Sequence, residues 1–204
     1  MLAGSAFPLR IQRMPAEARV TSIWKMQRLF VALFFIGFAG FFFWDGKIGY
    51  PRSNERWIAY EQHRTADRIS EWPADAASRG WTSKVPEKFY KPEEIVMQYV
   101  CGVVSGILGL IVLGYWAAQK DRVLKTAEGA VFAPSGKRIP FDSIIGLGKK
   151  NWEKKGLAIV RYEVDGRRGK FVLDDYKFEA EPTHKILEEI EGHLLAQIAE
   201  TEQK

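Results

Sequence analysis

Two uninterrupted apolar runs dominate the pattern of hydrophobic and polar positions along this chain. Residues 29–44 read LFVALFFIGFAGFFFW, and residues 95–118 read IVMQYVCGVVSGILGLIVLGYWAA without a formal charge. At about 1.5 Å per residue the second run extends roughly 36 Å, more than the roughly 30 Å hydrocarbon core of a bilayer. Both runs are apolar on every side, which favours membrane-spanning helices over core helices of a soluble protein. The pattern therefore predicts two transmembrane helices.

The first run is short for a bilayer, so we extend the predicted helix back to Trp24. Helix 24–44 then places Trp24 and Trp44 at opposite interfaces, where indole rings prefer to lie. The long stems of Lys25 and Arg28 can carry their charges to the headgroups. The small-residue cleavage pattern of a signal peptide is missing after the run. We therefore expect an uncleaved anchor.

The distribution of charge predicts which side of the membrane each segment occupies. The first 28 residues hold five basic residues and one acidic residue, whereas the loop 45–94 holds nine of each and the tail 119–204 holds 16 basic and 15 acidic residues. The positive-inside tendency then places the basic N-terminus (1–23) and the tail (119–204) in the cytosol and the loop outside it. Because no basic stripe accompanies the excess charge, we do not expect a nucleic-acid partner.

Small residues recur along both apolar runs at the spacing that lets helices approach closely. The second run contains a G-x-x-x-G motif, and the first run has two glycines on one face. The predicted packing residues are Gly37, Gly40, Gly102, Ser105, Gly106 and Gly109. Their seam could join the two helices of one chain or two copies of the chain. The single cysteine, Cys101, is expected to be a small apolar side chain in the membrane.

In the loop we expect a helix over about 53–72. Gly49-Tyr50-Pro51 is predicted to break the first transmembrane helix, and Trp72-Pro73 to end the loop helix. Aromatic and basic residues share one face of this helix, at Trp57, Tyr60, Arg64 and Arg68. That face is expected to rest on lipid headgroups, and a recognition surface is the alternative. His63 has no histidine or cysteine nearby, so no metal site is predicted there.

The tail alternates short β-branched or aromatic segments with turn residues, which predicts an antiparallel sheet. Residues 157–164 (LAIVRYEV) form the clearest strand, Asp165-Gly166 the clearest hairpin turn, and residues 170–174 the returning strand. An amphipathic helix from Pro182 to about residue 200 carries an apolar stripe that should cover the sheet. The predicted fold class is an α+β membrane protein, with a two-helix transmembrane hairpin and a small antiparallel β domain closed by a C-terminal helix.

This order of short strands and a closing helix resembles the pleckstrin-homology-like (PH-like) fold. Residues 136–144 (GKRIPFDSI) resemble a strand and turn common in bacterial PH-like domains, and residues 157–175 match the later hairpin. Such domains often lie beside paired membrane helices. The resemblance implies a bacterial inner-membrane protein with two spans, a domain that usually has seven strands, and a role in binding lipids or proteins.

Basic residues crowd two turns of the tail and are the candidate lipid-binding site. They are Lys149, Lys150, Lys154, Lys155, Arg167, Arg168 and Lys170. Basic loops held near an anionic leaflet gain about 1 kcal/mol per charge. The alternative is that these turns are polar only because turns are exposed to solvent.

No constellation for catalysis, cofactor binding or metal binding emerges from the sequence, so we expect a protein that is not an enzyme. The histidines do not cluster, and Asp174-Asp175 more plausibly ends a strand than binds a metal. The expected function is that of a membrane-anchored binding or scaffold protein, an accessory subunit of a larger assembly. Its expected partners are the bilayer and either another protein or a second copy. Sensing of anionic lipid by the basic turns is the alternative.

Overall fold

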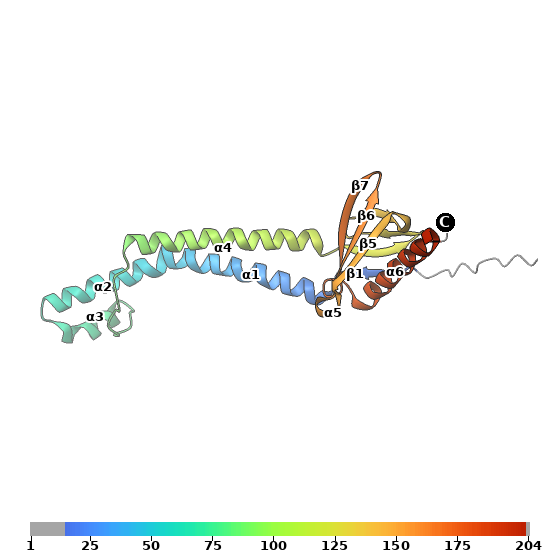
Figure 1. Cartoon of the computed structure of the whole chain (residues 1–204). Helices are drawn as coiled ribbons and strands as arrows, with labels where there is room; N and C mark the ends of the chain where they lie inside the picture. The colour runs from blue at the N-terminus through green and yellow to red at the C-terminus, as the bar shows by residue number, and fades with distance from the viewer. Residues whose placement is uncertain (1–14, 203–204) are drawn as a thin grey trace, which may run out of the picture. The chain divides into compact units, whose positions relative to one another are not determined.

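The computed structural model describes residues 15–202, which divide into two compact units (Figure 1). One unit is helical and comprises residues 27–116. The other holds all the β-strands of the described chain and combines residues 15–26 with residues 117–202. The architecture confirms the α+β class, with two long apolar helices, two antiparallel sheets and a C-terminal helix.

The first apolar run forms α1 (Ser22–Trp44), which starts where the Thr21 hydroxyl accepts a hydrogen bond from the Trp24 N–H at 3.3 Å. The helix does not break at Pro51 as predicted. It continues through a π turn (Asp45–Gly49) into α2 (Tyr50–Thr65). Pro51 lies in the first turn of α2, directly after the hydrogen-bond register has shifted, and its missing N–H is tolerated there.

The second apolar run forms α4 (Pro92–Gln119). Pro92 occupies the first helical position, and the Glu94 carboxylate accepts a hydrogen bond from the Lys91 N–H at 2.9 Å. Only 17% and 11% of the most apolar windows of the two long helices are buried within the chain. Side chains such as Phe30, Leu110 and Ile111 are exposed. Both helices are thus long and apolar enough to cross a membrane, and neither is largely buried within the described chain.

The G-x-x-x-G face of α4 packs against α1 of the same chain. A Cβ added to Gly109 would lie 2.7 Å from the Ile36 side chain and 3.2 Å from the Ala32 carbonyl oxygen. Added to Gly102 it would meet the Phe43 ring at 3.1 Å, and added to Gly106 it would contact the Ala39 Cβ at 3.6 Å. These glycines therefore allow the two helices to approach closely within one chain.

The other predicted packing residues lie elsewhere. Ser105 is half-buried beside this seam, whereas Gly37 and Gly40 are exposed and an added Cβ on either would meet nothing within 4 Å. The face of α1 that meets α4 carries Ala32, Ile36, Ala39 and Phe43, at helical spacing. Gly37 and Gly40 each follow one of these residues directly and point away from α4. Of the two seams predicted for these glycines, the structure does not place them in the one within the chain, and a seam between two copies stays a prediction.

The loop between the long helices forms a small helical module. The predicted helix over 53–72 is instead α2, which ends at Thr65, followed by a short 3₁₀ turn (Ile69–Glu71) and α3 (Trp72–Ser78). Trp72-Pro73 begins α3 and does not end a helix, because proline suits the first helical turn. Ala59, Trp72 and Ala76 form the buried core, with Tyr60 and Trp81 against it.

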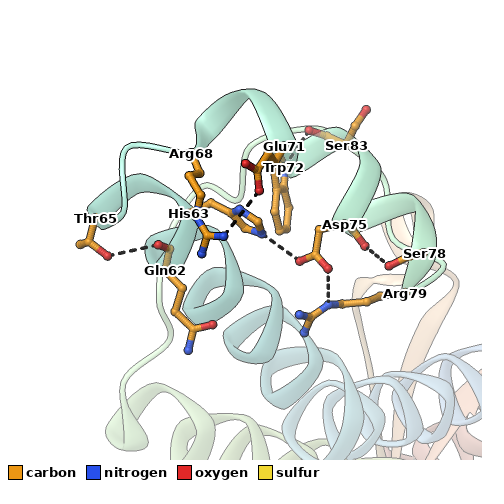
Figure 2. Close-up of polar contacts among 10 residues, drawn as sticks. All are labelled: Gln62, His63, Thr65, Arg68, Glu71, Trp72, Asp75, Ser78, Arg79 and Ser83. Carbon is orange, nitrogen blue, oxygen red and sulfur yellow. Dashed lines mark hydrogen bonds and ion pairs between the residues drawn. The ribbon is translucent and has the colours of Figure 1, made fainter.

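Polar contacts hold α3 against α2 (Figure 2). His63 Nε2 lies 3.1 Å from the Asp75 carboxylate, which also accepts a hydrogen bond from Arg79 Nε at 3.1 Å. The Trp72 indole N–H donates to the Ser83 carbonyl at 2.9 Å. His63 is thus a packing residue of the module, paired with the Asp75 carboxylate.

We expect this module to loosen in acid. The hydrogen bond from His63, and then that from Arg79, lower the pKa of the Asp75 carboxyl. Its contribution to stability is therefore complete above its ordinary pKa and lost as the pH falls through the depressed folded value. Hydrogen exchange of residues 72–79, corrected for intrinsic rate, should accelerate several-fold below about pH 4. The D75N variant should exchange fast at every pH, and E71Q, which removes a looser exposed pair, should behave like the parent. Acid-insensitive exchange in the parent would contradict this prediction.

Among residues 15–202, seven strands in two antiparallel sheets form the β domain. The first sheet has the order β1-β2-β3-β4 and the second β5-β6-β7. The strand bounds are β1 Glu17–Arg19, β2 Val123–Ala127, β3 Ala130–Phe132, β4 Arg138–Pro140, β5 Ile144–Asn151, β6 Leu157–Val164 and β7 Arg167–Asp174. The hairpin at Asp165-Gly166 is confirmed, with both residues at positive φ.

Strand β1 precedes the first long helix, and sequence analysis did not predict it. It pairs antiparallel with β2, so that Ala18 lies opposite Leu124 and both are fully buried. Ala16 extends the pairing, because its carbonyl accepts a hydrogen bond from the Thr126 N–H and its N–H donates to the Thr126 hydroxyl. The helical unit is thus inserted between the first and second strands of the β domain.

The C-terminal helix α6 (Ala180–Glu202) covers the sheets with the first part of its apolar stripe. Ile186, Leu187 and Ile190 are buried, and Thr183, also buried, donates its hydroxyl proton to the Glu179 carbonyl at 2.7 Å. The helix begins two residues before the predicted Pro182, because Asp174 accepts hydrogen bonds from the Tyr176 and Lys177 N–H groups and turns the chain out of β7.

Candidate functional site

A concave surface of the β domain is the groove between β5 and the second half of α6. It has a volume of about 770 Å³, in the range of ligand-binding clefts. Strand β5 forms one wall; it pairs with β6 on one side and, among residues 15–202, with no strand on the other. Its free edge presents unpaired backbone groups, which is the usual template for an added strand.

The opposite wall is the part of the α6 stripe that the sheet does not cover. The stripe was predicted to cover one end or face of the sheet, and in the structure its last two turns extend beyond that contact. Leu195 and Ile198 are 68% and 55% exposed, and Ile145 on β5 faces the same groove at 53%. These aliphatic side chains give both walls of the groove an apolar surface that a ligand could cover.

Specific contacts fix the width of the groove at both ends. At one end Lys149 on β5 forms an ion pair with Glu191 on α6 at 2.5 Å. At the other, the His193 ring stacks on Phe141 with centroids 4.1 Å apart, and Gln197 donates to the Phe141 carbonyl at 3.2 Å. These contacts hold α6 beside β5 over Glu191–Gln197, the stretch that contains Leu195.

The structure does not gather the seven predicted lipid-binding residues into one patch. Lys149, Lys150, Lys154 and Lys155 lie at the end of the second sheet where β6 begins, and Arg167, Arg168 and Lys170 at or toward the end where β6 finishes. Eight residues of strand separate the two ends by about 23 Å. Lys149 is paired with Glu191, and Arg168 with Glu163 at 2.9 Å.

Of the two groups, only the first lies where the long helices join the domain. Phe178, just beyond the end of β7, forms a bridge with Val20, and the Thr21 N–H donates to the Lys177 carbonyl. The Lys177 ammonium donates to Gln119 at the end of α4 and lies 5.2 Å from the Trp24 ring on α1. Burial lowers the pKa of Lys177. This lysine therefore contacts both the first turn of α1 and the last residue of α4.

Among residues 15–202, no group of three or more histidine, cysteine and acidic side chains is placed to hold a metal ion. Asp174 caps the turn after β7, and Asp175 lies 3.1 Å from His184, so each has a structural partner. The groove beside β5 combines a strand edge that is unpaired within the described chain with exposed apolar side chains, and it is the candidate site on which the proposal below is built. In comparisons with known proteins, no protein-family model, no curated protein and no solved structure matches this chain.

Proposed function

We propose that this chain is a membrane-anchored binding protein whose β domain holds an extended segment of another protein in the groove beside β5. The observation that carries the proposal is the apolar stripe of α6, which continues uncovered past the sheet beside an open strand edge. A segment added to β5 would pair with its backbone, and apolar side chains at alternate positions would meet Ile145, Leu195 and Ile198.

The PH-like resemblance supports a binding role. Four strands and then three, in two antiparallel sheets followed by one helix, is the arrangement that this resemblance implies, with β1 supplying the seventh strand. In this proposal α1 and α4 cross the inner membrane of a bacterium and both termini are cytosolic, as the basic N-terminal segment favours. The β domain would then be held at the cytosolic surface, in the role of a scaffold or accessory subunit.

A peptide selection on the full chain in detergent tests the groove. We expect enriched peptides to carry apolar residues at alternate positions and to bind at least about tenfold more weakly to L195D and I198D, because each variant places a charge against the apolar ligand. V172D is the matched control, since Val172 is also an exposed apolar residue but lies on β7, outside the groove.

Two results would refute a protein partner in this groove. One is selected peptides that bind V172D as weakly as L195D. The other is a parent chain that self-associates and becomes monomeric in L195D without peptide, since the groove would then join two copies. For the membrane anchor, a chain that remains dissolved in buffer without detergent would contradict the proposal.

A further inference from the structure

A second concave site lies in the helical module, between the start of α2 and the turn after α3. It has a volume of about 490 Å³, and its walls include Arg52, Ser53, Arg56, Arg79 and Trp81, with Glu55 as its acidic member. Three guanidinium groups face one carboxylate in the lining, and although Arg79 is also paired with Asp75, the positive charges still outnumber the negative ones. The groove proposal does not use this pocket. Such a pocket attracts an anion.

Two of the three arginines, Arg56 and Arg79, are each positioned by a hydrogen bond from a single guanidinium nitrogen. Arg79 donates through Nε to Asp75, as Figure 2 shows, and its guanidinium carbon lies 5.2 Å from the centre of the Trp81 ring. Arg56 donates through one terminal nitrogen to the Lys84 carbonyl, while its Nε is buried without a hydrogen-bond partner in the described structure. Since a guanidinium has five N–H donors, each arginine keeps donors for a ligand.

The turn after α3 builds the wall that carries Arg79 and Trp81. Gly80 adopts a φ of 71°, its N–H donates to the Ala77 carbonyl, and the Trp81 N–H donates to the Ala76 carbonyl at 2.8 Å. This is the Schellman pattern, in which glycine supplies the left-handed conformation that ends the helix. The turn brings the indole against its neighbouring arginine and is fixed by backbone bonds before any ligand arrives.

We propose that Arg52, Arg56 and Arg79 bind a phosphate group. Planar guanidinium forks match phosphate oxygens in pairs, and the Ser53 hydroxyl adds a donor beside them. Glu55 is placed to accept a hydrogen bond from a hydroxyl or ammonium group carried next to the phosphate. Arg52 follows Trp44, the end of the apolar run, by eight residues, or about 12 Å of helix. If α1 crosses a bilayer, lipid phosphates are therefore the nearest dense anions, and free phosphate offers the same chemistry.

Binding of two probes to the full chain in a neutral detergent tests the proposal. We expect ³¹P NMR titrations to show saturable broadening of short-chain phosphatidylglycerol, of inorganic phosphate, or of both. If the signals of both probes broaden, the phosphate group alone is enough for binding. If only the lipid signal broadens, the natural ligand is a lipid headgroup, and if only the inorganic phosphate signal broadens, it is a soluble phosphate. The affinity should fall about tenfold in R52Q and further in R52Q/R79Q. The R52Q variant removes one charged donor and breaks none of the hydrogen bonds or ion pairs described above for the module.

R68Q is the matched control, because Arg68 lies in the same module, forms only a 3.7 Å pair with Glu71 and does not line the pocket. It should bind as the parent does. The R52K variant keeps the charge but loses the fork, so its affinity should lie between those of the parent and R52Q. The proposal would be overturned if neither probe's ³¹P signal broadened. It would also be overturned if the binding affinity fell equally in R68Q and R52Q.

Discussion

Replacing Gly109 with leucine should separate α1 from α4. A Cβ at this position would lie 3.1 Å from the Ile36 backbone nitrogen and 3.2 Å from the Ala32 carbonyl oxygen, in addition to its 2.7 Å approach to the Ile36 side chain. Backbone atoms in the middle of a helix cannot turn aside as a flexible side chain can. The larger residue must therefore push the helices apart, and the packing along the seam is lost with an expected cost of about 3 kcal/mol.

Disulfide formation measures this separation directly. In a Cys101→Ala background, the pair Ala39→Cys and Gly106→Cys should oxidise readily, because a Cβ at Gly106 lies 3.6 Å from the Ala39 Cβ, close to the separation in natural disulfides. Adding Gly109→Leu should abolish most of the cross-link. Gly114→Leu makes the same change on the same helix where an added Cβ meets nothing within 4 Å, and should leave the yield unchanged.

A high cross-linking yield in the Gly109→Leu chain would show that the helices tolerate the extra volume, and the close approach would then not depend on glycine. Cross-links that form only between two chains, detected by mixing differently tagged copies, would instead assign the seam to a dimer. The structure records the contact within one chain, so we expect intramolecular product.

The seam also shows how far sequence pattern reaches in a helical hairpin. The spacing of Gly102, Gly106 and Gly109 marks one face of α4, and the structure uses that face. On α1 the same criterion selected Gly37 and Gly40, but the face in contact carries Ala32, Ile36, Ala39 and Phe43. Small residues permit close approach without requiring it, and in a run with seven phenylalanines the packed face depends on how large side chains fit the partner helix.

The β domain was predictable where the signals are local. The strand 157–164, the Asp165-Gly166 turn and the returning strand all follow from residue type and neighbouring turns. Strand β1 has only three residues with one buried side chain, and its partner lies more than 100 positions later in the chain. Its extended conformation comes from that distant pairing, which no window of sequence around Glu17–Arg19 contains.

The groove and the arginine pocket were missed for a related reason. The α6 stripe is visible in the sequence, but how many of its turns are covered depends on the length and position of the sheet. Likewise Arg52 and Arg79 are 27 positions apart, and they meet only because α2 continues through the π turn and α3 folds back. Because the sequence analysis expected the helix to end near Pro51, it gave no reason to expect Arg52 and Arg79 in one pocket.

A charged side chain at Ala18 should unfold the β domain while leaving the helical unit intact. Ala18 is fully buried opposite Leu124, so Ala18→Lys places an ammonium among apolar side chains with no acidic partner provided for it. The expected loss is about 3 kcal/mol or more. Loss of the β1–β2 pairing would also remove the two hydrogen bonds between Ala16 and the buried Thr126.

Hydrogen exchange of residues 123–127 in the full chain measures this effect, since the β2 amides are protected only while the first sheet is intact. Glu17→Lys is the matched control: it adds the same side chain one position away on an exposed site. It should lose only the surface pair with Arg19 and gain a mild repulsion from Lys125, which lies opposite on β2. We expect exchange over β2 to accelerate by at least about a hundredfold in Ala18→Lys and by less than about fivefold in Glu17→Lys.

Hydrogen exchange of the α4 amides tests whether the segment before the first long helix stabilises only the β domain or the helical unit as well. Because residues 15–26 cluster with residues 117–202, α4 amides over 95–116 should keep their protection in Ala18→Lys. If β2 stays protected in that variant, β1 contributes nothing essential to the sheet. If α4 loses protection together with β2, the two units unfold as one, and the insertion of the helices between β1 and β2 couples their stabilities.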